Sequence, residues 1–267
     1  MQGRAVASSL GLCVCVSWLL AGCAADTGEA PSEAVGEARA AARPDRSFTV
    51  DFSGCSEMAS LTPVPVANVR DKVPAGYALA NEAAGTTFIV VRIAHCSGMA
   101  IDGEADGAGT VAQVGVNLVS PDGTGDINNY TLWYYTTSRA LFQKLKRVGI
   151  DEAQWTPGID YRYTASGPGA PRLDITVPGN PAFTVGGPVT ATGGPVPFTA
   201  NWWGDRGDER VRMNTTLPAI GFGGATMSLT TSPRSKLGRV LGSGAATFPI
   251  FDSYNEFAGA HMVVEQR

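Results

Sequence analysis

Residues 87–94 read TFIVVRIA, an almost uninterrupted run of β-branched and aliphatic side chains. Because successive side chains of a strand point to opposite faces, a run without alternation predicts a strand buried on both faces. Arg92 is the one charge in the run, and an unpaired charge there would be costly. A carboxylate such as Glu57 would neutralise it, either as a structural ion pair or as the resting partner in a site for a ligand carboxylate.

Strand patterns recur along the rest of the chain. Aromatic and β-branched residues fill residues 129–135, and similar but shorter runs follow. The further runs are 48–52, 111–119, 159–164, 172–177, 182–185, 209–216, 225–230 and 261–265. Gly, Pro and Asp mark turns between them, for example the GGP of residues 193–195. The pattern predicts a mainly β fold, either an antiparallel β-barrel or a double sheet.

One segment departs from this pattern, because residues 137–148 have the spacing of a helix. Leu141, Leu145 and Val148 fall on one face at i, i+4 and i+7. Gly149 follows directly and is the residue type that most often ends a helix. The sequence therefore predicts one clear helix near 137–148 within the β domain.

The N-terminus has the composition of a secretion signal at residues 1–22. Arg4 is the only charge before Cys23, and the mostly apolar stretch 5–20 is short for a membrane span. Residues 20–23 read LAGC, which resembles the lipobox of bacterial lipoproteins, where the cysteine receives a diacylglycerol and the chain is cut before it. The alternative is an ordinary cleaved signal. We expect an exported cell-envelope protein whose partner is a membrane, bound through the lipid on Cys23.

Residues 23–46 are rich in Ala and Glu and contain no aromatic residue. Such a composition cannot bury much apolar surface, so we expect a flexible tether. The predicted organisation is a signal peptide at 1–22, this tether, and a single β-rich domain at 47–267.

The composition and the motifs argue against several classes of function. A net charge of −4 and a pI near 5.2 argue against a nucleic-acid partner. The chain has only two histidines, His95 and His261, which makes a histidine-rich metal site unfavourable. The acidic stretches 102–107 and 121–126 are better explained as polar loops than as calcium loops. We expect no metal, and without a glycine-rich phosphate loop we expect no cofactor.

The cysteines predict one disulfide. Cys13 and Cys15 leave with the signal and Cys23 carries the lipid, which leaves Cys55 and Cys96. An even pair in an exported domain favours a disulfide, and each cysteine lies at the end of an apparent strand. Closing a loop of about 40 residues would contribute roughly 3–4 kcal/mol. The alternative is two buried free thiols.

Two adjacent tryptophans suggest a ligand site. In a strand, Trp202 and Trp203 would point to opposite faces, so one ring can enter the core while the other faces a cavity. The alternative is simple packing. Together with Arg92, Glu57 and His95 they are the candidate ligand-binding residues.

A family resemblance adds to this interpretation. Residues 63–65 read PVP and residues 73–77 read VPAGY, followed by the strand at 88–94 and later by the strand at 129–135 with its helix. This order resembles acetoacetate decarboxylase-like proteins, in which a V-P-x-G-Y phrase precedes a strand of a large β-barrel or double-sheet cone. The resemblance covers roughly residues 48–265 and implies a mostly antiparallel barrel with a central apolar cavity.

Enzymes of that family use a lysine Schiff base. The four lysines here are Lys72, Lys144, Lys146 and Lys236, and none lies in a match to the family's catalytic segment. We therefore expect the barrel to bind a small apolar or carboxylated molecule. Two alternatives remain open. One is a Schiff-base enzyme of decarboxylase or aldolase type that uses Lys236 or Lys144. The other is a structural envelope lipoprotein without a ligand.

Overall fold

The computed structural model describes residues 47–267. The predicted signal at 1–22, the lipid site at Cys23 and the tether at 23–46 lie outside the described residues. The described part is mainly β, as the sequence predicts. Its strands are β1 (Ser47–Pro65), β2 (Thr86–Ile101), β3 (Glu104–Asn117), β4 (Ile127–Thr136), β5 (Ala153–Trp155), β6 (Asp160–Thr164), β7 (Arg172–Val177), β8 (Phe183–Arg206), β9 (Glu209–Ala225), β10 (Ser228–Thr231), β11 (Ala245–Thr247) and β12 (Phe251–Gln266). Its helices are η1 (Val66–Asn68), η2 (Arg70–Lys72), η3 (Glu82–Ala84), α1 (Arg139–Val148) and α2 (Lys236–Leu241).

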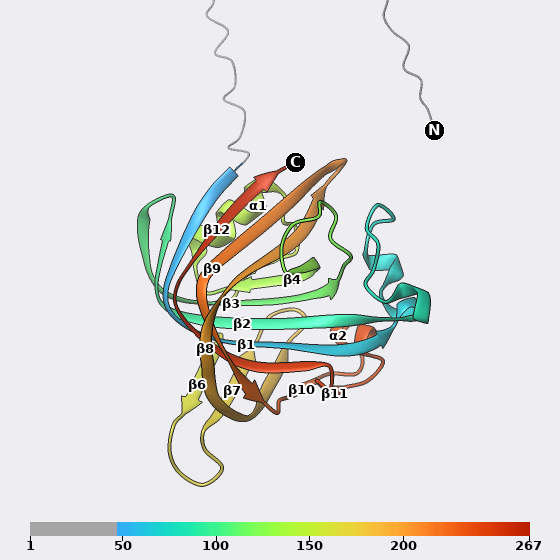
Figure 1. Cartoon of the computed structure of the whole chain (residues 1–267). Coiled ribbons are helices and arrows are strands. Elements are labelled where there is room, and N and C mark those ends of the chain that lie inside the picture. Colours follow the sequence, from blue (N-terminus) through green and yellow to red (C-terminus); the bar gives the residue numbers. More distant parts are fainter. Residues whose placement is uncertain (1–46) are drawn as a thin grey trace, which may run out of the picture. The chain divides into compact units, whose positions relative to one another are not determined.

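Within residues 47–267, seven strands close into a ring. The order is β8, β9, β12, β1, β2, β3 and β4, and β4 pairs again with β8. Neighbours in the ring are antiparallel except at this last pairing, where residues 127–130 run parallel to residues 200–203. Figure 1 shows the long strands curving around the ring. The expected antiparallel barrel is confirmed, with one parallel seam that the sequence does not predict.

The buried run in β2 explains why the barrel has a core on each side of its wall. Val90 and Ala94 belong to one hydrophobic cluster, while Ile89, Val91 and Ile93 belong to another. The first cluster lies inside the ring, because Val90, Trp202 and Leu217 of that cluster line one internal cavity. The second lies outside the ring and includes side chains of β7 and β10 and of helix α2. Alternating side chains of one strand therefore serve two cores.

Helix α1 confirms the predicted helix. The Ser138 hydroxyl accepts a hydrogen bond from the Leu141 backbone N–H at 2.9 Å, and Gly149 ends the helix with a left-handed φ of 105°. The apolar face buries Leu145 and Val148 in the inner core. Among residues 47–267, no helix has the length and hydropathy of a membrane span.

The predicted disulfide between Cys55 and Cys96 is present. The two residues are directly opposite each other on β1 and β2, with Cα atoms 4.1 Å apart. Both cysteines are buried. They lie in the middle of two long strands and not at strand ends, because both strands continue past the cysteines as the wall of the barrel.

The predicted turn at residues 193–195 is wrong, because this segment lies inside β8. The pairing of β8 with β9 shifts register between Val189 and Thr192 and again between Thr192 and Pro195. Bulges of this kind accommodate glycine and proline within a strand, since the missing side chain or N–H falls where the ladder is already interrupted.

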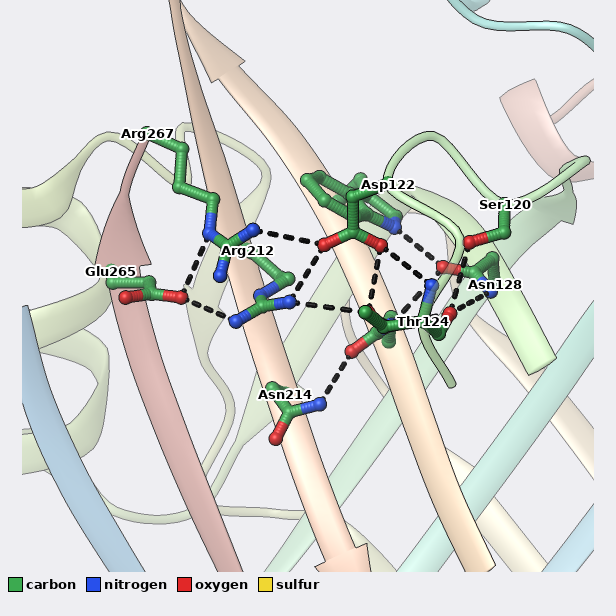
Figure 2. Close-up of polar contacts among 10 residues, drawn as sticks. Ser120, Asp122, Thr124, Asn128, Arg212, Asn214, Glu265 and Arg267 are labelled. Carbon is green, nitrogen blue, oxygen red and sulfur yellow. Dashed lines mark hydrogen bonds and ion pairs between the residues drawn. The ribbon is translucent and has the colours of Figure 1, made fainter. Parts of the chain in front are cut away.

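The loop between β3 and β4 is held to β9 and β12 by an ionic network. Asp122 accepts hydrogen bonds from Arg212 at 2.7 Å and from Arg267 at 2.9 Å. Both arginines also bond Glu265, on β12. Figure 2 shows these side chains linking the loop to β9 and β12. Asp122 lies in the stretch 121–126, which the sequence predicts to be a polar loop, and its carboxylate bonds two arginines.

Candidate functional site

The interior of the ring contains an apolar cavity of about 370 Å³. Side chains reach it from β1, β2, β4, β8, β9 and β12. The apolar lining includes Leu61, Val90, Phe198, Leu217, Phe222 and Phe251. Its volume lies within the range of small-molecule pockets, about 300–1,000 Å³. The central cavity that the family resemblance implies is therefore present.

Arg92 and Glu57 meet in this cavity. The Arg92 Nε and Nη2 atoms both contact one oxygen of Glu57, Oε2, at 2.7 and 2.6 Å. The two side chains are 12% and 6% exposed, so the pair is held largely away from water. Arg92 Nη1 donates a third bond to Gln113 Oε1 at 2.7 Å. The predicted pairing of Arg92 with Glu57 is thus seen at the cavity wall.

Arg92 keeps donors to spare. An arginine has five N–H groups, and Glu57 and Gln113 take three of those on Arg92. Among residues 47–267 no further acceptor contacts the guanidinium, which leaves one N–H on Nη1 and one on Nη2. Free N–H groups of a guanidinium suit a carboxylate.

Three polar residues of this site were not identified from the sequence. Gln113 lies directly opposite Arg92 on β3, and Tyr134 lies opposite Gln113 on β4. Burial raises the pKa of Tyr134, although the nearby charge of Arg92 opposes this, so the phenol stays protonated at neutral pH. Asn255, on β12, lies opposite Glu57, and its Nδ2 approaches Glu57 Oε1 at 3.4 Å. A polar Gln113 among the valines of the run 111–119 is the one sequence signal for these residues.

Trp202 is the tryptophan that lines the cavity. It is 2% exposed, and its ring occupies space that a glycine leaves free. A Cβ atom at Gly115 would clash with the Trp202 ring and with the Tyr130 carbonyl oxygen. Gly115 therefore allows the tryptophan to enter the ring.

Trp203 points the other way and does not line this cavity. It lies in the outer core, where its Nε1 donates to Asn128 Oδ1 at 2.9 Å. Tyr77, from the V-P-x-G-Y phrase, lies beside it with ring centroids 6.4 Å apart, and donates from its hydroxyl to Asp205 at 2.7 Å. The predicted opposite orientation of the two tryptophans is seen, with both rings buried.

His95 also lies away from the cavity. It is exposed on β2, stacks on Tyr161 with centroids 5.5 Å apart, and contacts Thr110 Oγ1 at 2.9 Å. The structure therefore brings Arg92, Glu57 and Trp202 together at one site and places His95 and Trp203 elsewhere.

The lysines are all outside the ring cavity. All four lie within residues 47–267, and none is among the cavity-lining residues. Lys144 pairs with Asp102, a residue of the other acidic stretch. Lys236 and Lys72 line a separate groove of about 390 Å³, together with Glu152. Burial raises the pKa of Glu152. The described residues contain no group of three or more side chains that could hold a metal ion.

Comparisons with known proteins identify the fold. No family model and no curated protein matches the chain. Solved structures do match, and they show that the chain has the acetoacetate decarboxylase-like fold. At 9–11% identity the likeness is one of fold alone.

Three of these structures can be named. The chain is similar to an acetoacetate decarboxylase-like enzyme from Sphingomonas wittichii (11% identity, TM-score 0.53, 83% of this chain and 92% of that one). It is also similar to the acetoacetate decarboxylase of Legionella pneumophila (10%, TM-score 0.55, 82% and 86%). A third is an enduracididine biosynthesis enzyme complexed with the condensation product of pyruvate and imidazole 4-carboxaldehyde (10%, TM-score 0.51, 84% and 89%).

Proposed function

We propose that the barrel binds a small, largely apolar molecule that carries a carboxylate. The observation that supports this most directly is Arg92, an arginine with two spare N–H groups in the wall of an apolar cavity. The ligand carboxylate would accept both groups, and its apolar part would lie against the aromatic and aliphatic lining.

The surroundings of Arg92 favour this use. Glu57 balances the charge of Arg92 but contacts it through a single oxygen, which leaves part of the guanidinium open. Charge-assisted hydrogen bonds are strong where water is excluded. Burial of the apolar part would add about 0.8 kcal/mol for each CH₂ group removed from water.

Calorimetric titration tests the proposal. 4-Methylpentanoate should bind, and 4-methylpentan-1-ol, which has the same carbon skeleton without the carboxylate, should bind more weakly. Arg92→Met should weaken binding of the acid far more than binding of the alcohol. The matched control is Arg162→Met, because Arg162 is exposed on β6 and pairs with Asp160 outside the cavity. Equal affinity for acid and alcohol in the wild-type protein would contradict the proposal, as would no binding of either probe at millimolar concentration.

The cellular location of the domain is part of the same proposal. The lipobox-like residues ending at Cys23, with a tether at 23–46, support a domain carried on a membrane of the cell envelope by a lipid anchor. A ligand-binding domain held there would meet its ligand outside the cytoplasm.

A lysine-dependent enzyme is the second candidate, supported by the fold of the matching enzymes and by the groove of Lys236. Lys236 and Glu152 line the same groove, and the raised pKa of Glu152 is a feature of proton-transfer sites. Borohydride reduction in the presence of acetoacetate or pyruvate, followed by peptide mass spectrometry, tests it. An adduct on Lys236 that is lost in Lys236→Ala would support the enzyme, and no adduct on any lysine would remove it.

A further inference from the structure

Beside the polar end of the ring cavity lies a hydrogen-bond acceptor that no other described residue pairs with. Asn255 is fully buried, and its Oδ1 has no hydrogen-bond partner among the described residues. Leaving a buried acceptor unpaired is costly, so such an atom is typical of a place that a ligand completes.

The side chain of Asn255 projects into the ring. Asn255 lies directly opposite Glu57 on one side and Phe222 on the other, and both of these residues line the cavity. Directly opposite residues on neighbouring strands share a face of the sheet. Asn255 therefore belongs to the same inner surface, next to the polar end of the cavity.

The orientation of the Asn255 amide follows from its neighbour. Glu57 is an acceptor when ionised, so the amide must turn its donor, Nδ2, toward Glu57 Oε1, at 3.4 Å. Its acceptor, Oδ1, consequently faces away from that carboxylate. Among residues 47–267, no donor lies closer to Glu57 Oε1 than Asn255 Nδ2, at 3.4 Å. Glu57 Oε1 is therefore a second acceptor that is only weakly hydrogen-bonded.

Donors and acceptors thus surround the single carboxylate of Glu57. Arg92 contacts Oε2 and offers two free N–H groups, while Asn255 contacts Oε1 and offers a free oxygen. Arg92, on β2, and Asn255, on β12, therefore flank the same carboxylate from the two strands beside β1. A ligand that satisfies both needs a carboxylate and a hydrogen-bond donor, and 2-hydroxy and 2-amino acids are the smallest acids that carry both.

We infer that the cavity selects apolar acids that bear a hydroxyl or ammonium group on the carbon next to the carboxylate. The inference rests on the proposed function, because it assumes that Arg92 holds a carboxylate. Asn255 is the specificity-determining residue, accepting the hydrogen bond of the 2-hydroxyl or 2-ammonium group. An acid without that donor would leave Oδ1 unpaired when the cavity closes around it.

The test compares ligands that differ only at this carbon. The probes are 4-methylpentanoate, 2-hydroxy-4-methylpentanoate, leucine and 4-methyl-2-oxopentanoate, titrated calorimetrically into the purified protein. The hydroxy acid or the amino acid should bind about tenfold more tightly than 4-methylpentanoate, since a buried unpaired acceptor costs on that order. The oxo acid, which has an acceptor in place of the donor, should show no gain. The stronger of the first two distinguishes a hydroxy acid from an amino acid.

Asn255→Leu keeps the side-chain shape and removes the amide. It should abolish the gain while retaining affinity for 4-methylpentanoate. Asn68→Leu is the matched control, because the Asn68 amide donates to the Val240 carbonyl outside the ring. Thermal unfolding of both variants confirms that they are folded.

The outcomes separate the two proposals. If 4-methylpentanoate binds and wild-type protein shows no preference for the hydroxy or amino acid, the inference fails while the proposed function stands. A preference that survives in folded Asn255→Leu also overturns it. If none of the four acids binds wild-type protein, the proposed function itself fails.

Discussion

Arg92 and Glu57 form a diagonal pair across β1 and β2. The residue directly opposite Glu57 is Ala94, and the residue directly opposite Arg92 is Ala59. Diagonal neighbours are about 7–8 Å apart at the backbone, which long side chains can span. The two alanines leave the space in which the guanidinium and the carboxylate meet, so the geometry of the site depends on small neighbours as well as on the charges.

Arg92→Met should destabilise the fold by about 3–5 kcal/mol, because it leaves Glu57 buried and without its counter-ion. The double variant Glu57→Gln with Arg92→Met should recover much of that loss. Urea unfolding monitored by circular dichroism measures both. If the single variant is as stable as the wild-type protein, Glu57 is not held away from water as the structure shows.

Gly115→Ala should lower stability by about 1–3 kcal/mol, as overpacked cores do. The added methyl group would meet both a backbone oxygen of β4 and the Trp202 ring, and the backbone atom cannot rotate away. Gly194→Ala is the control, because no atom lies within 4 Å of its added Cβ. Equal unfolding midpoints for the two variants would contradict the tight approach at Gly115.

Replacing Cys55 and Cys96 together with alanine should cost about 3–4 kcal/mol, given the 41-residue separation. Peptide mapping of the native exported protein without reductant should recover the two cysteine peptides linked. Recovery of both as free thiols would show that the bond does not form in the cell.

Stability should depend on Asp122 in a particular pH window. Burial by itself would raise the Asp122 pKa, but the Thr124 hydrogen bonds and the charges of Arg212 and Arg267 outweigh it and lower the pKa. A carboxylate with a lowered folded-state pKa stabilises the fold fully above its ordinary pKa, about 3.9, and this stabilisation is lost as the pH falls through the lowered value.

Asp122→Asn should therefore reduce the free energy of unfolding at neutral pH, and this effect should shrink progressively in acid as the pH falls below about 3.9. Asp151→Asn is the control, because Asp151 is exposed and its Oδ1 lies 3.4 Å from Lys146 Nζ, so this carboxylate is also paired but not held away from water. A deficit of the same size at neutral pH and in acid would mean that the Asp122 charge is not the cause.

Cys23→Ser should prevent lipid attachment and release the protein from the membrane fraction. Metabolic labelling with a radioactive fatty acid, followed by fractionation, measures both effects. Cys13→Ser, within the predicted signal, should change neither. A Cys23→Ser protein that is still labelled and still sediments with membranes would show that the lipobox interpretation is wrong.

The sequence predicts those parts of the site that follow from the free-energy cost of burying a residue within its own strand. An arginine inside TFIVVRIA needs a counter-ion, and paired tryptophans in a strand must face opposite ways, so Arg92, Glu57 and Trp202 can be proposed without a structure. The register of the sheet cannot be predicted in this way. Asn255 reaches Glu57 across 198 residues of chain, and Gln113 meets Arg92 only because β2 and β3 pair in one register among several.

The long strands show the same limit. Glycine and proline at 193–195 are typical of a turn, yet they lie in β8, where the bulged pairing with β9 absorbs them. The length of a strand is decided by what pairs with it, and this information is distributed along the whole chain.

The parallel seam between β4 and β8 has a consequence for folding. The hairpins β1–β2–β3–β4 and β8–β9 can each form from residues that are close in the chain, whereas the seam joins Asn128 to Asn201 across 73 residues. Contacts of such long range carry a loop-closure cost before they contribute any stability, so we expect them to form late. Until the seam and β12 are in place, Arg92 belongs to an open sheet and faces water. The proposed carboxylate site therefore exists only in the completed ring, and a bound ligand would report closure of the whole barrel.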